Sequence, residues 1–315
     1  MDKEIQALVE KFLEKPYFLD MGKGLLSRLF NAPVESIREA KVLARQKRKS
    51  IQMLSDLPKI LLLDIETAPM AAWVWGRWKQ NIHLEQTMAE WFILTWSAKW
   101  FLSADMLSEK LTPSEVINQD DKRIMRPLWD LINDADIIIG HNCDAFDVPK
   151  INSRFLLNGF PPPSPYRTID TKLISAKQFG FSSNKLDALA EYFGFDKKLP
   201  TTMELWTRCM KGDLEALKYM EIYNRKDVQV LEEVYIKLRP WMKNHPNSGM
   251  YTEDDVTTCS ACGSKDMSLM EDRFYYTQVG KYPVYRCADC GAVSRGRKTT
   301  IDREKNKKMV TSIPR

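Results

Sequence analysis

Apolar and polar residues recur along this chain with helical spacing at its N-terminal end. Apolar side chains from Ile5 to Leu13 are spaced by three and four residues, which predicts an amphipathic helix over residues 2–15. The same spacing continues from Leu26 to Leu43, with a three-residue break at 31–33. Two short helices around such a break resemble a helix-turn-helix, although an ordinary helical hairpin used for packing fits the pattern equally.

Residues 58–240 alternate between short apolar runs and helical periodicity, which predicts a mixed α/β domain. The expected strands are 59–65, 91–101 and 136–140. The expected helices are 123–134, 147–157, 171–178, 184–194 and two stretches between 212 and 240.

The first of these strands ends in two carboxylates. Its apolar run, 60–63, lies between Pro58 and Pro69 and is typical of a strand buried on both faces. Asp64 and Glu66 are two residues apart, so their side chains point to the same side of the strand. Like charges this close repel each other, and a divalent cation held by carboxylates would relieve the repulsion. A solvated strand end is the alternative.

Two later segments supply further acids. Asp147 follows the apolar run 137–139 at an expected helix start. Tyr223 and Asp227 lie four residues apart on an apolar-periodic helix and therefore share a face. A third and a fourth carboxylate are thus available to complete a site with the first pair.

The chain resembles the DEDD superfamily of 3′→5′ exonucleases at these residues. Its three motifs occur in order as D-x-E, N-x-x-x-F-D and Y-x-x-x-D, matched by Asp64, Glu66, Asn142, Phe146, Asp147, Tyr223 and Asp227. Position 222 is Ile where the histidine subclass would have His, so the tyrosine (DEDDy) subclass is indicated. The resemblance covers about residues 58–240 and implies an RNase H-like fold, with a mixed sheet and flanking helices, over the domain 58–245.

The resemblance also implies a two-metal mechanism with Mg²⁺ or Mn²⁺. Asp64 would bridge both ions, and Glu66, Asp147 and Asp227 would complete their coordination. Tyr223 would orient the attacking water, since a phenol with a pKa of about 10 is a poor base at neutral pH.

Other residues near these motifs are expected to have lesser roles. Thr67 and Asn142 would contact the terminal nucleotide. His141 is expected to be structural, Phe146 to pack beneath the site and Asp170 to cap a helix.

Four of the six cysteines form two CxxC pairs near the C-terminal end: Cys259, Cys262, Cys287 and Cys290. A glycine follows each pair, and a hairpin turning near Gly280 is expected between them. This spacing predicts a structural zinc ribbon over residues 250–300 that binds one Zn²⁺. Two disulfides are the alternative, disfavoured for an intracellular chain because thiols stay reduced there.

Charge and composition suggest a polyanionic partner. The chain has 47 basic and 42 acidic residues, and its excess of +5 gathers at 41–49 and 291–315. The segment 1–57 is expected to be a helical domain that could contact DNA through Arg38, Lys41 and Arg45, and 301–315 a basic tail. The charged N-terminus lacks the apolar core of a signal peptide and no apolar run could span a bilayer, so a cytoplasmic protein without membrane contact is expected.

Six of the nine tryptophans fall between residues 70 and 100. Trp96 and Trp100 belong to the apolar face of an expected strand, whereas Trp73, Trp75 and Trp78 occupy a less regular stretch after the acidic pair. Those three could pack in a core or stack on bases.

These observations predict a metal-dependent 3′→5′ exonuclease that releases nucleoside monophosphates, with DNA favoured over RNA. The chain has no room for a polymerase domain, so it would act alone or beside a polymerase or another replication or repair protein. The alternatives are an exoribonuclease and an inactive, nucleic-acid-binding regulator. A pure binder has no need for four converging carboxylates, which disfavours the regulator.

Overall fold

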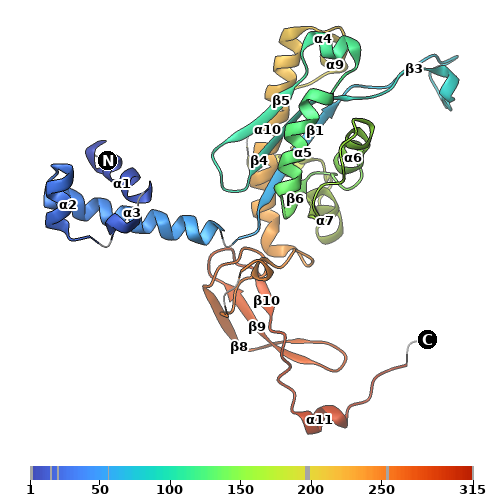
Figure 1. The fold of residues 1–315 in the computed structure, drawn as a ribbon. Coiled ribbons are helices and arrows are strands. Elements are labelled where there is room, and N and C mark those ends of the chain that lie inside the picture. The colour runs from blue at the N-terminus through green and yellow to red at the C-terminus, as the bar shows by residue number, and fades with distance from the viewer. Residues whose placement is uncertain are drawn as a thin grey trace. The chain divides into compact units, whose positions relative to one another are not determined.

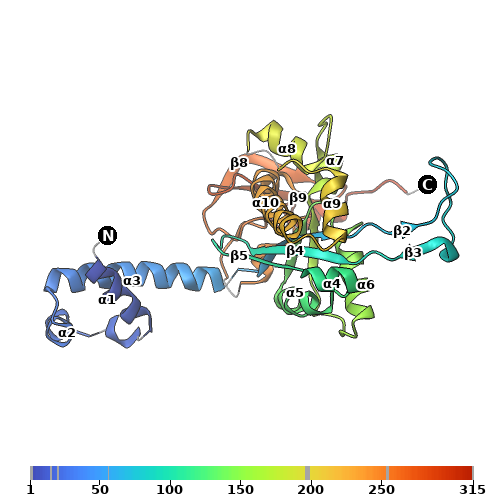
Figure 2. The ribbon, with the colours of Figure 1, turned by 90° about the horizontal axis from the view of Figure 1, so that it is seen from above.

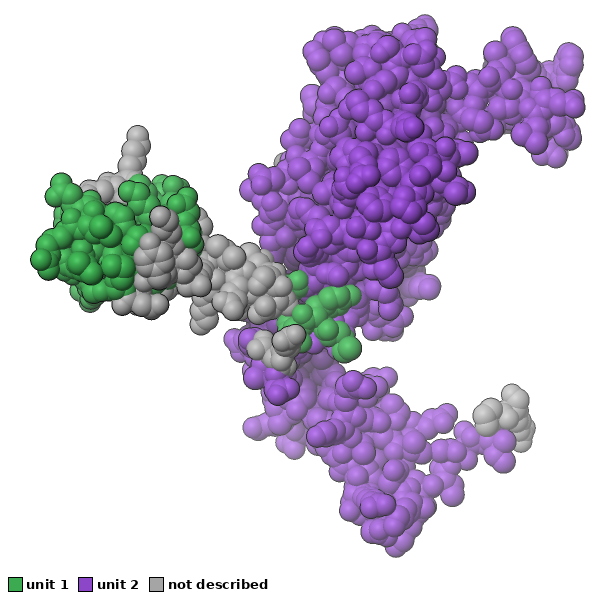
Figure 3. Space-filling model, viewed as in Figure 1, with its two compact units in different colours: residues 1–57, 250–254 green, residues 58–249, 255–315 purple. Residues whose placement is uncertain are grey.

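The computed structural model divides the chain into two compact units, which are coloured separately in Figure 3. One comprises residues 1–57 and 250–254, and the other residues 58–249 and 255–315. The described residues are 3–14, 16–19, 21–55, 57–195, 199–252 and 255–313.

The first unit is helical, as expected. It contains α1 (Lys3–Glu14), a 3₁₀ turn η1 (Pro16–Leu19), α2 (Lys23–Phe30) and α3 (Val34–Ser55). Its core combines the apolar stripes of the three α-helices with three phenylalanine rings, those of Phe12, Phe18 and Phe30. The helical periodicity in the sequence arises because each helix buries one stripe against the others.

The predicted break between two helices is confirmed, but two details of the helix-turn-helix interpretation are wrong. Asn31 ends α2 in the left-handed region (φ 49°), and α3 is a long helix of 22 residues rather than a short one. Lys41 is only 6% exposed and its Nζ donates to the carbonyl of Met21 at 2.5 Å, so it supports the fold instead of facing DNA. The side chain of Arg45 lies outside the described residues.

A five-stranded mixed sheet forms the centre of the second unit (Figure 1). Its order is β5-β4-β1-β6-β7, with β1 antiparallel to β4 and parallel to β6. The strands are β1 (Ile60–Thr67), β4 (Ile93–Trp100), β5 (Met106–Lys110), β6 (Ile137–Gly140) and β7 (Arg167–Asp170). Strand β1 is central, and its residues 60–63 are buried on both faces, as the unbroken apolar run predicted.

Helices cover both faces of this sheet (Figure 2), with α8 and α10 on one side and α4 and α5 on the other. They are α4 (Pro113–Asn118), α5 (Lys122–Asp134), α6 (Asp147–Leu157), α7 (Thr171–Gln178), α8 (Leu186–Phe193), α9 (Met203–Met210) and α10 (Leu214–Leu238). The mixed α/β fold class is therefore confirmed. None of the described helices has the length and apolar character needed to cross a membrane.

The structure differs from the sequence expectations in several elements, among them helices α4 and α9, which were not predicted. The two helical stretches expected between 212 and 240 are one continuous 25-residue helix, α10, because the chain has no glycine or proline between Leu214 and Leu238 to interrupt it. Strands β5 and β7 were not predicted. Both are short strands at the edges of the sheet and lack an apolar run, since an edge strand is less completely buried than a central one.

The segment between β1 and β4 forms an arm, defined here as residues 68–92. Two short strands, β2 (Ala71–Ala72) and β3 (Thr87–Ala89), pair at its base, and a 3₁₀ turn η2 (Leu84–Gln86) precedes β3. In Figures 1 and 2 the arm reaches away from the sheet and its helices.

The C-terminal part of the second unit is a three-stranded antiparallel sheet of order β10-β9-β8. Its strands are β8 (Met267–Tyr276), β9 (Lys281–Cys287) and β10 (Val293–Arg295), and the predicted hairpin near Gly280 is confirmed. Two 3₁₀ turns, η3 (Arg239–Trp241) and η4 (Ser248–Met250), precede this sheet, and a short helix, α11 (Arg303–Lys307), follows it.

Candidate active site

Asp64 and Glu66 lie side by side on the central strand of the large sheet. Opposite them on β4 are Ser97 and Thr95, and the register of β1 and β4 shifts just after Glu66. Both acids belong to β1 itself, which continues to Thr67 rather than ending at residue 65. Strand geometry therefore directs both carboxylates to one face, as the i, i+2 spacing predicted.

Helix α10 brings Asp227 to this pair. The helix packs on β1 and β4, and Asp227 is only 3% exposed. Asp64, Glu66 and Asp227 each place a carboxylate oxygen within 4.8 Å of the others. Three hard oxygen donors at this spacing fit a divalent cation such as Mg²⁺ or Mn²⁺.

Asn224 is a further residue of the site that the sequence motifs did not reveal. It is fully buried on α10, and its Nδ2 donates to Oδ2 of Asp64 at 2.6 Å. This hydrogen bond holds the carboxylate of Asp64 in one orientation. Asn224 precedes Asp227 by three residues and therefore shares its helix face, which is the pattern that could have identified it.

Tyr223 is half-buried beside the acids, and its hydroxyl donates a hydrogen bond to Asp227. Burial raises the pKa of Tyr223 well above its ordinary value, and the charges of Asp227, Glu66 and Asp64 raise it further. The phenol therefore keeps its proton at neutral pH and acts as a hydrogen-bond donor.

Asp147 approaches β1 from the start of α6. Its Oδ1 accepts a hydrogen bond from the backbone N–H of Ile65, between the two strand acids, at 3.2 Å. Burial raises the pKa of Asp147 to about 7, the charge of Asp170 adds to this, and the Ile65 hydrogen bond opposes it. Asp147 thus lies next to the three-carboxylate group but faces the strand backbone.

The loop before α6 and the end of β1 hold the remaining predicted residues. Asn142 has a positive φ of 72°, and its side-chain oxygen accepts from Nζ of Lys172 at 3.1 Å. Thr67 lies at the last position of β1, half-buried. The expected packing of Phe146 beneath the site is wrong, since this ring is 37% exposed and instead contacts the ammonium group of Lys150.

Two neighbours of this loop have the structural roles expected of them. The ring nitrogens of His141 contact the hydroxyl of Thr171 and the carbonyl of Asn184, both at 2.9 Å. Asp170 caps α7 by accepting from the amides of residues 172 and 173. It also accepts from the amides of Asn142 and residue 144, so it fixes the loop that leads to Asp147.

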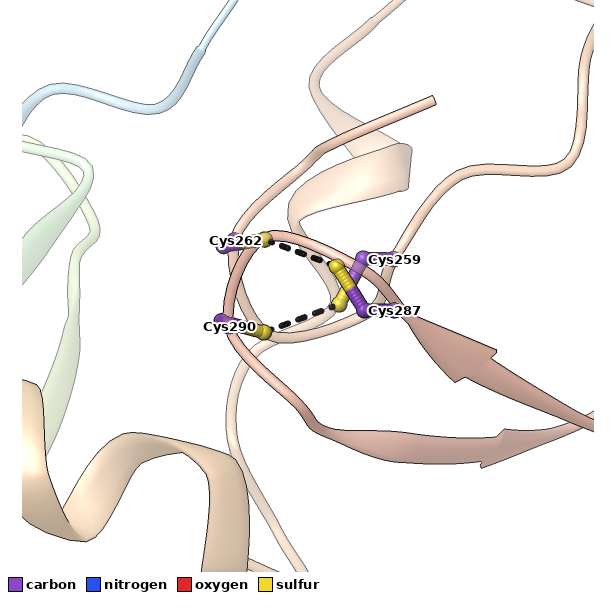
Figure 4. Close-up of side chains that lie close together, drawn as sticks. All are labelled: Cys259, Cys262, Cys287 and Cys290. Carbon is purple, nitrogen blue, oxygen red and sulfur yellow. Dashed lines mark hydrogen bonds between the residues drawn. The ribbon is translucent and has the colours of Figure 1, made fainter. Parts of the chain in front are cut away.

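The second candidate metal centre is formed by the four cysteines of the two CxxC pairs (Figure 4). Their sulfurs all lie within 4.8 Å of one another, and the pairs Cys259–Cys290 and Cys262–Cys287 are each 3.6 Å apart. A disulfide requires about 2.05 Å, and all four cysteines are free. Tetrahedral zinc with Zn–S bonds of about 2.3 Å has sulfurs about 3.8 Å apart, so this donor set fits Zn²⁺.

Backbone conformation explains why a glycine follows each CxxC pair. Gly263 and Gly291 have φ of 75° and 77°, in the left-handed region that favours glycine. Each donates its N–H to the carbonyl of the first cysteine of its pair, closing a tight turn around the sulfurs. Hydrogen bonding by the thiol of Cys262 also lowers the pKa of Cys259 to about 5.

Part of this domain is similar to a known protein family. Residues 105–239 match the family RNase_H_2, described as RNase_H superfamily. Two proteins of Arabidopsis thaliana, Protein NEN2 and Protein NEN3, are 33% and 32% identical to this chain over 82 residues. Those 82 residues are 25% of this chain but only 16% and 15% of the two plant proteins, so the chain spans a small part of their length.

A solved structure is more distantly similar. The family B DNA polymerase from the hyperthermophilic archaeon Pyrobaculum calidifontis is 19% identical, with a TM-score of 0.43 over 58% of this chain and 25% of that chain. A likeness at this level carries no argument about activity. The family match includes Asp147, Tyr223 and Asp227 and begins after the arm. The mixed sheet and the family match agree on an RNase H-like fold for the domain that carries the three-carboxylate group.

Proposed function

We propose that this protein is a metal-dependent 3′→5′ exonuclease of the tyrosine subclass of DEDD enzymes. The observation that carries the proposal is the convergence of Asp64, Glu66 and Asp227, whose carboxylate oxygens lie within 4.8 Å of one another. Three acids held this close repel each other unless cations bind between them. The match of residues 105–239 to the RNase_H superfamily supports a nuclease.

Two divalent cations bound here would activate a water and stabilise the leaving 3′ oxygen of the scissile phosphodiester. Asp64, Glu66 and Asp227 would hold them directly. Asn224 keeps Asp64 in one orientation through its 2.6 Å hydrogen bond. Asp147 would join the coordination sphere after losing its proton and turning from the Ile65 amide.

Tyr223 would position the water. Its raised pKa keeps the hydroxyl protonated, so it cannot remove a proton at neutral pH. Once Asp227 holds a cation, the hydroxyl can turn its one proton from that carboxylate to the water oxygen and align a lone pair with the phosphorus, which lowers the entropic cost of attack. The product would be a nucleoside monophosphate.

The remaining assignments complete the proposal. Thr67 and Asn142 would contact the terminal nucleotide, and DNA is favoured over RNA as substrate. Residues 58–245 would be the catalytic domain and 1–57 a helical domain. The segment 250–300 would be a ribbon stabilised by Zn²⁺. Together with the tail at 301–315, it would strengthen binding to nucleic acid or to a replication or repair protein.

The test is cleavage of end-labelled strands by the full chain with Mg²⁺, with Mn²⁺ and with neither. A 5′-labelled strand should shorten stepwise, whereas a 3′ label should be released at once as a mononucleotide. Asp64→Asn and Asp227→Asn should each lower turnover by several orders of magnitude while strand binding persists, because the cations stabilise the transition state more than the ground state. Asp134→Asn is the matched control, since this exposed acid pairs with Lys59 on the surface.

The outcomes separate the alternatives. Stepwise cleavage of RNA but not of DNA would identify an exoribonuclease. Binding without metal-dependent cleavage would identify an inactive regulator and refute the proposal. Full activity in either site variant would show that the three-carboxylate group is not the catalytic centre.

A further inference from the structure

The arm between β1 and β4 presents three tryptophans to solvent. Trp73, Trp75 and Trp78 are 70%, 99% and 84% exposed. Large aromatic side chains are usually at least partly buried, because their apolar area is costly to leave in water. Within the described part of the chain, none of the three rings packs in an apolar cluster of the second unit. Three such rings on one short segment indicate a binding surface.

Hydrogen bonds give this arm a defined backbone. Trp73 and Gln86 are linked twice, by Trp73 N–H to the Gln86 carbonyl at 2.9 Å and by Gln86 Nε2 to the Trp73 carbonyl at 3.0 Å. Gln80 Nε2 donates to the carbonyl of Trp78 at 2.8 Å. Gln86 Oε1 accepts from the N–H of His83 at 2.9 Å. The three rings therefore lie on a loop whose backbone is held in place by hydrogen bonds, several of them from glutamine side chains.

The charged side chains beside the three rings indicate the kind of partner. Residues 73–84, which hold the rings, include Arg77 and Lys79 but no acidic residue, whereas Glu85 and Glu90 lie in the half of the arm that returns to β4. Exposed aromatic rings beside cationic side chains match a strand of nucleic acid, whose bases have flat faces and whose backbone is anionic. A duplex keeps its bases stacked inside, so the complementary ligand is a single strand.

The arm is a direct continuation of the strand that carries Asp64 and Glu66. Thr67 pairs with Ile93 across β1 and β4, and the N–H of Ala68 donates to the carbonyl of Phe92 at 2.8 Å, closing the base of the arm. Strand β1 therefore connects the arm, and any ligand bound to it, with the three-carboxylate group.

We propose that Trp73, Trp75 and Trp78 form a stacking platform for the bases of a single strand whose 3′ end lies at the three-carboxylate group. The inference rests on the proposed exonuclease function and extends it to the choice of substrate. Arg77 and Lys79 neutralise the phosphates between the stacked bases. The platform binds the strand on the 5′ side of the scissile bond, so it lowers KM on long strands without taking part in the chemical step.

The reach of the arm sets the strand length at which the platform acts. Trp75 lies eight positions after Thr67, and an extended chain advances at most roughly 26 Å over that distance at about 3.3 Å per residue. A stacked strand rises about 3.4 Å per nucleotide, so the platform lies up to about eight nucleotides from the catalytic carboxylates. A four-nucleotide strand spans about 14 Å, roughly half of this maximal reach, whereas a 20-nucleotide strand spans all of it.

The test compares the full chain with a variant in which Trp73, Trp75 and Trp78 are all replaced by alanine. Binding of fluorescein-labelled single-stranded DNA is measured by anisotropy in buffer free of Mg²⁺ and Mn²⁺, so the result does not depend on catalysis. Each stacked ring replaced by alanine weakens binding about fivefold or more. Two engaged rings therefore give at least about a 25-fold loss with a 20-nucleotide strand and no change with a four-nucleotide strand.

Two control variants identify the cause of a loss. The triple phenylalanine variant keeps flat rings and should retain most of the affinity. Trp241→Ala removes a tryptophan that is 67% exposed in η3, outside the arm, and should change nothing. For the unaltered protein, a 20-nucleotide strand with abasic sites at the fifth to eighth nucleotides from its 3′ end should bind as weakly as the intact strand binds to the triple alanine variant.

The possible results either support or overturn the inference. Unchanged affinity of the triple alanine variant for the 20-nucleotide strand would overturn it and leave a protein partner as the occupant of the arm. Equal losses with short and long strands would also overturn it, because they would indicate a general defect. Arm-dependent binding by a chain without nuclease activity would support the platform and refute the exonuclease proposal alone.

Discussion

Replacing Asp147 by asparagine should make the protein more stable while removing its activity. Asp147 is 3% exposed, and burial raises its pKa to about 7. At pH 8 the folded state must therefore keep a charge that its surroundings disfavour. Asparagine is neutral and nearly isosteric, and its Oδ1 can still accept the hydrogen bond from the Ile65 N–H, now 3.2 Å from Asp147.

The magnitude follows from the pKa. An unfolded aspartate titrates near 3.9, so the folded pKa of about 7 is roughly three units higher. Between these two values the folded state binds more protons than the unfolded state, and stability therefore falls as pH rises through that interval. At about 1.4 kcal/mol per unit the full loss is up to about 4 kcal/mol above pH 7, and it is absent below about pH 4.

Thermal unfolding of both proteins from pH 4 to pH 8, in buffer free of Mg²⁺ and Mn²⁺, measures this effect. A gain of 2 to 4 kcal/mol should raise Tm by roughly 4 to 16 °C at pH 8, given about 2 to 4 °C per kcal/mol for a domain of this size. The gain should shrink towards pH 4. Added Mg²⁺ should stabilise the unaltered protein more than Asp147→Asn, because only the carboxylate can serve as an anionic ligand.

Asp121→Asn is the matched control. This acid is fully buried too, but Arg154 holds it through two hydrogen bonds of 2.6 and 2.7 Å. Removing its charge would leave a guanidinium without its partner, so Tm should fall. If Asp147→Asn lowers Tm at pH 8, or if its gain does not depend on pH, the assigned cost of the buried charge is wrong.

Four further predictions concern the other parts of the site and the C-terminal segment. Tyr223→Phe should slow turnover by roughly 10 to 10³-fold in single-turnover assays with Mg²⁺ affinity unchanged; a loss as large as that of Asp227→Asn would mean that Tyr223 is needed to assemble the metal site. Asn224→Ala should weaken Mg²⁺ binding about 10- to 100-fold in activity titrations, because the 2.6 Å hydrogen bond to Asp64 is lost. The control Gln229→Ala, on the exposed side of α10, should leave Mg²⁺ binding unchanged. Elemental analysis should find about one zinc per chain and less in Cys259→Ser, whereas the isolated Cys209→Ser should retain it; disulfides in non-reducing mass spectrometry would contradict the ribbon. Replacing Lys305 and Lys308 by glutamine should lower the slope of log K against log salt for single strands by about 0.7 for each phosphate that is no longer neutralised, and an unchanged slope would exclude the tail from binding.

The sequence predicted those parts of the site that depend on local spacing. The i, i+2 spacing of Asp64 and Glu66 and the i, i+4 spacing of Tyr223 and Asp227 are fixed by strand and helix geometry. The unbroken apolar run before Asp64 likewise predicted a strand buried on both faces, and β1 is that strand. The two CxxC pairs, each followed by a glycine, predicted a four-cysteine metal site, and the four sulfurs do lie within 4.8 Å of one another.

Only the tertiary structure decided which of these side chains meet and how they are partnered. The hydrogen bond between Asn224 and Asp64 joins residues 160 positions apart, so no local pattern contains it. Lys41 had the position of a DNA-binding side chain, yet the packing of its helix buries it against the Met21 carbonyl. The strand pairing that ends at Thr67 and Ile93 directs the chain outward and leaves Trp75 almost wholly exposed, where composition alone allowed a core residue. The spacing of residues along one helix or strand fixes the direction in which their side chains point. The burial of those side chains and their hydrogen-bond partners depend on the elements that pack against that helix or strand, and this packing forms only when the chain folds.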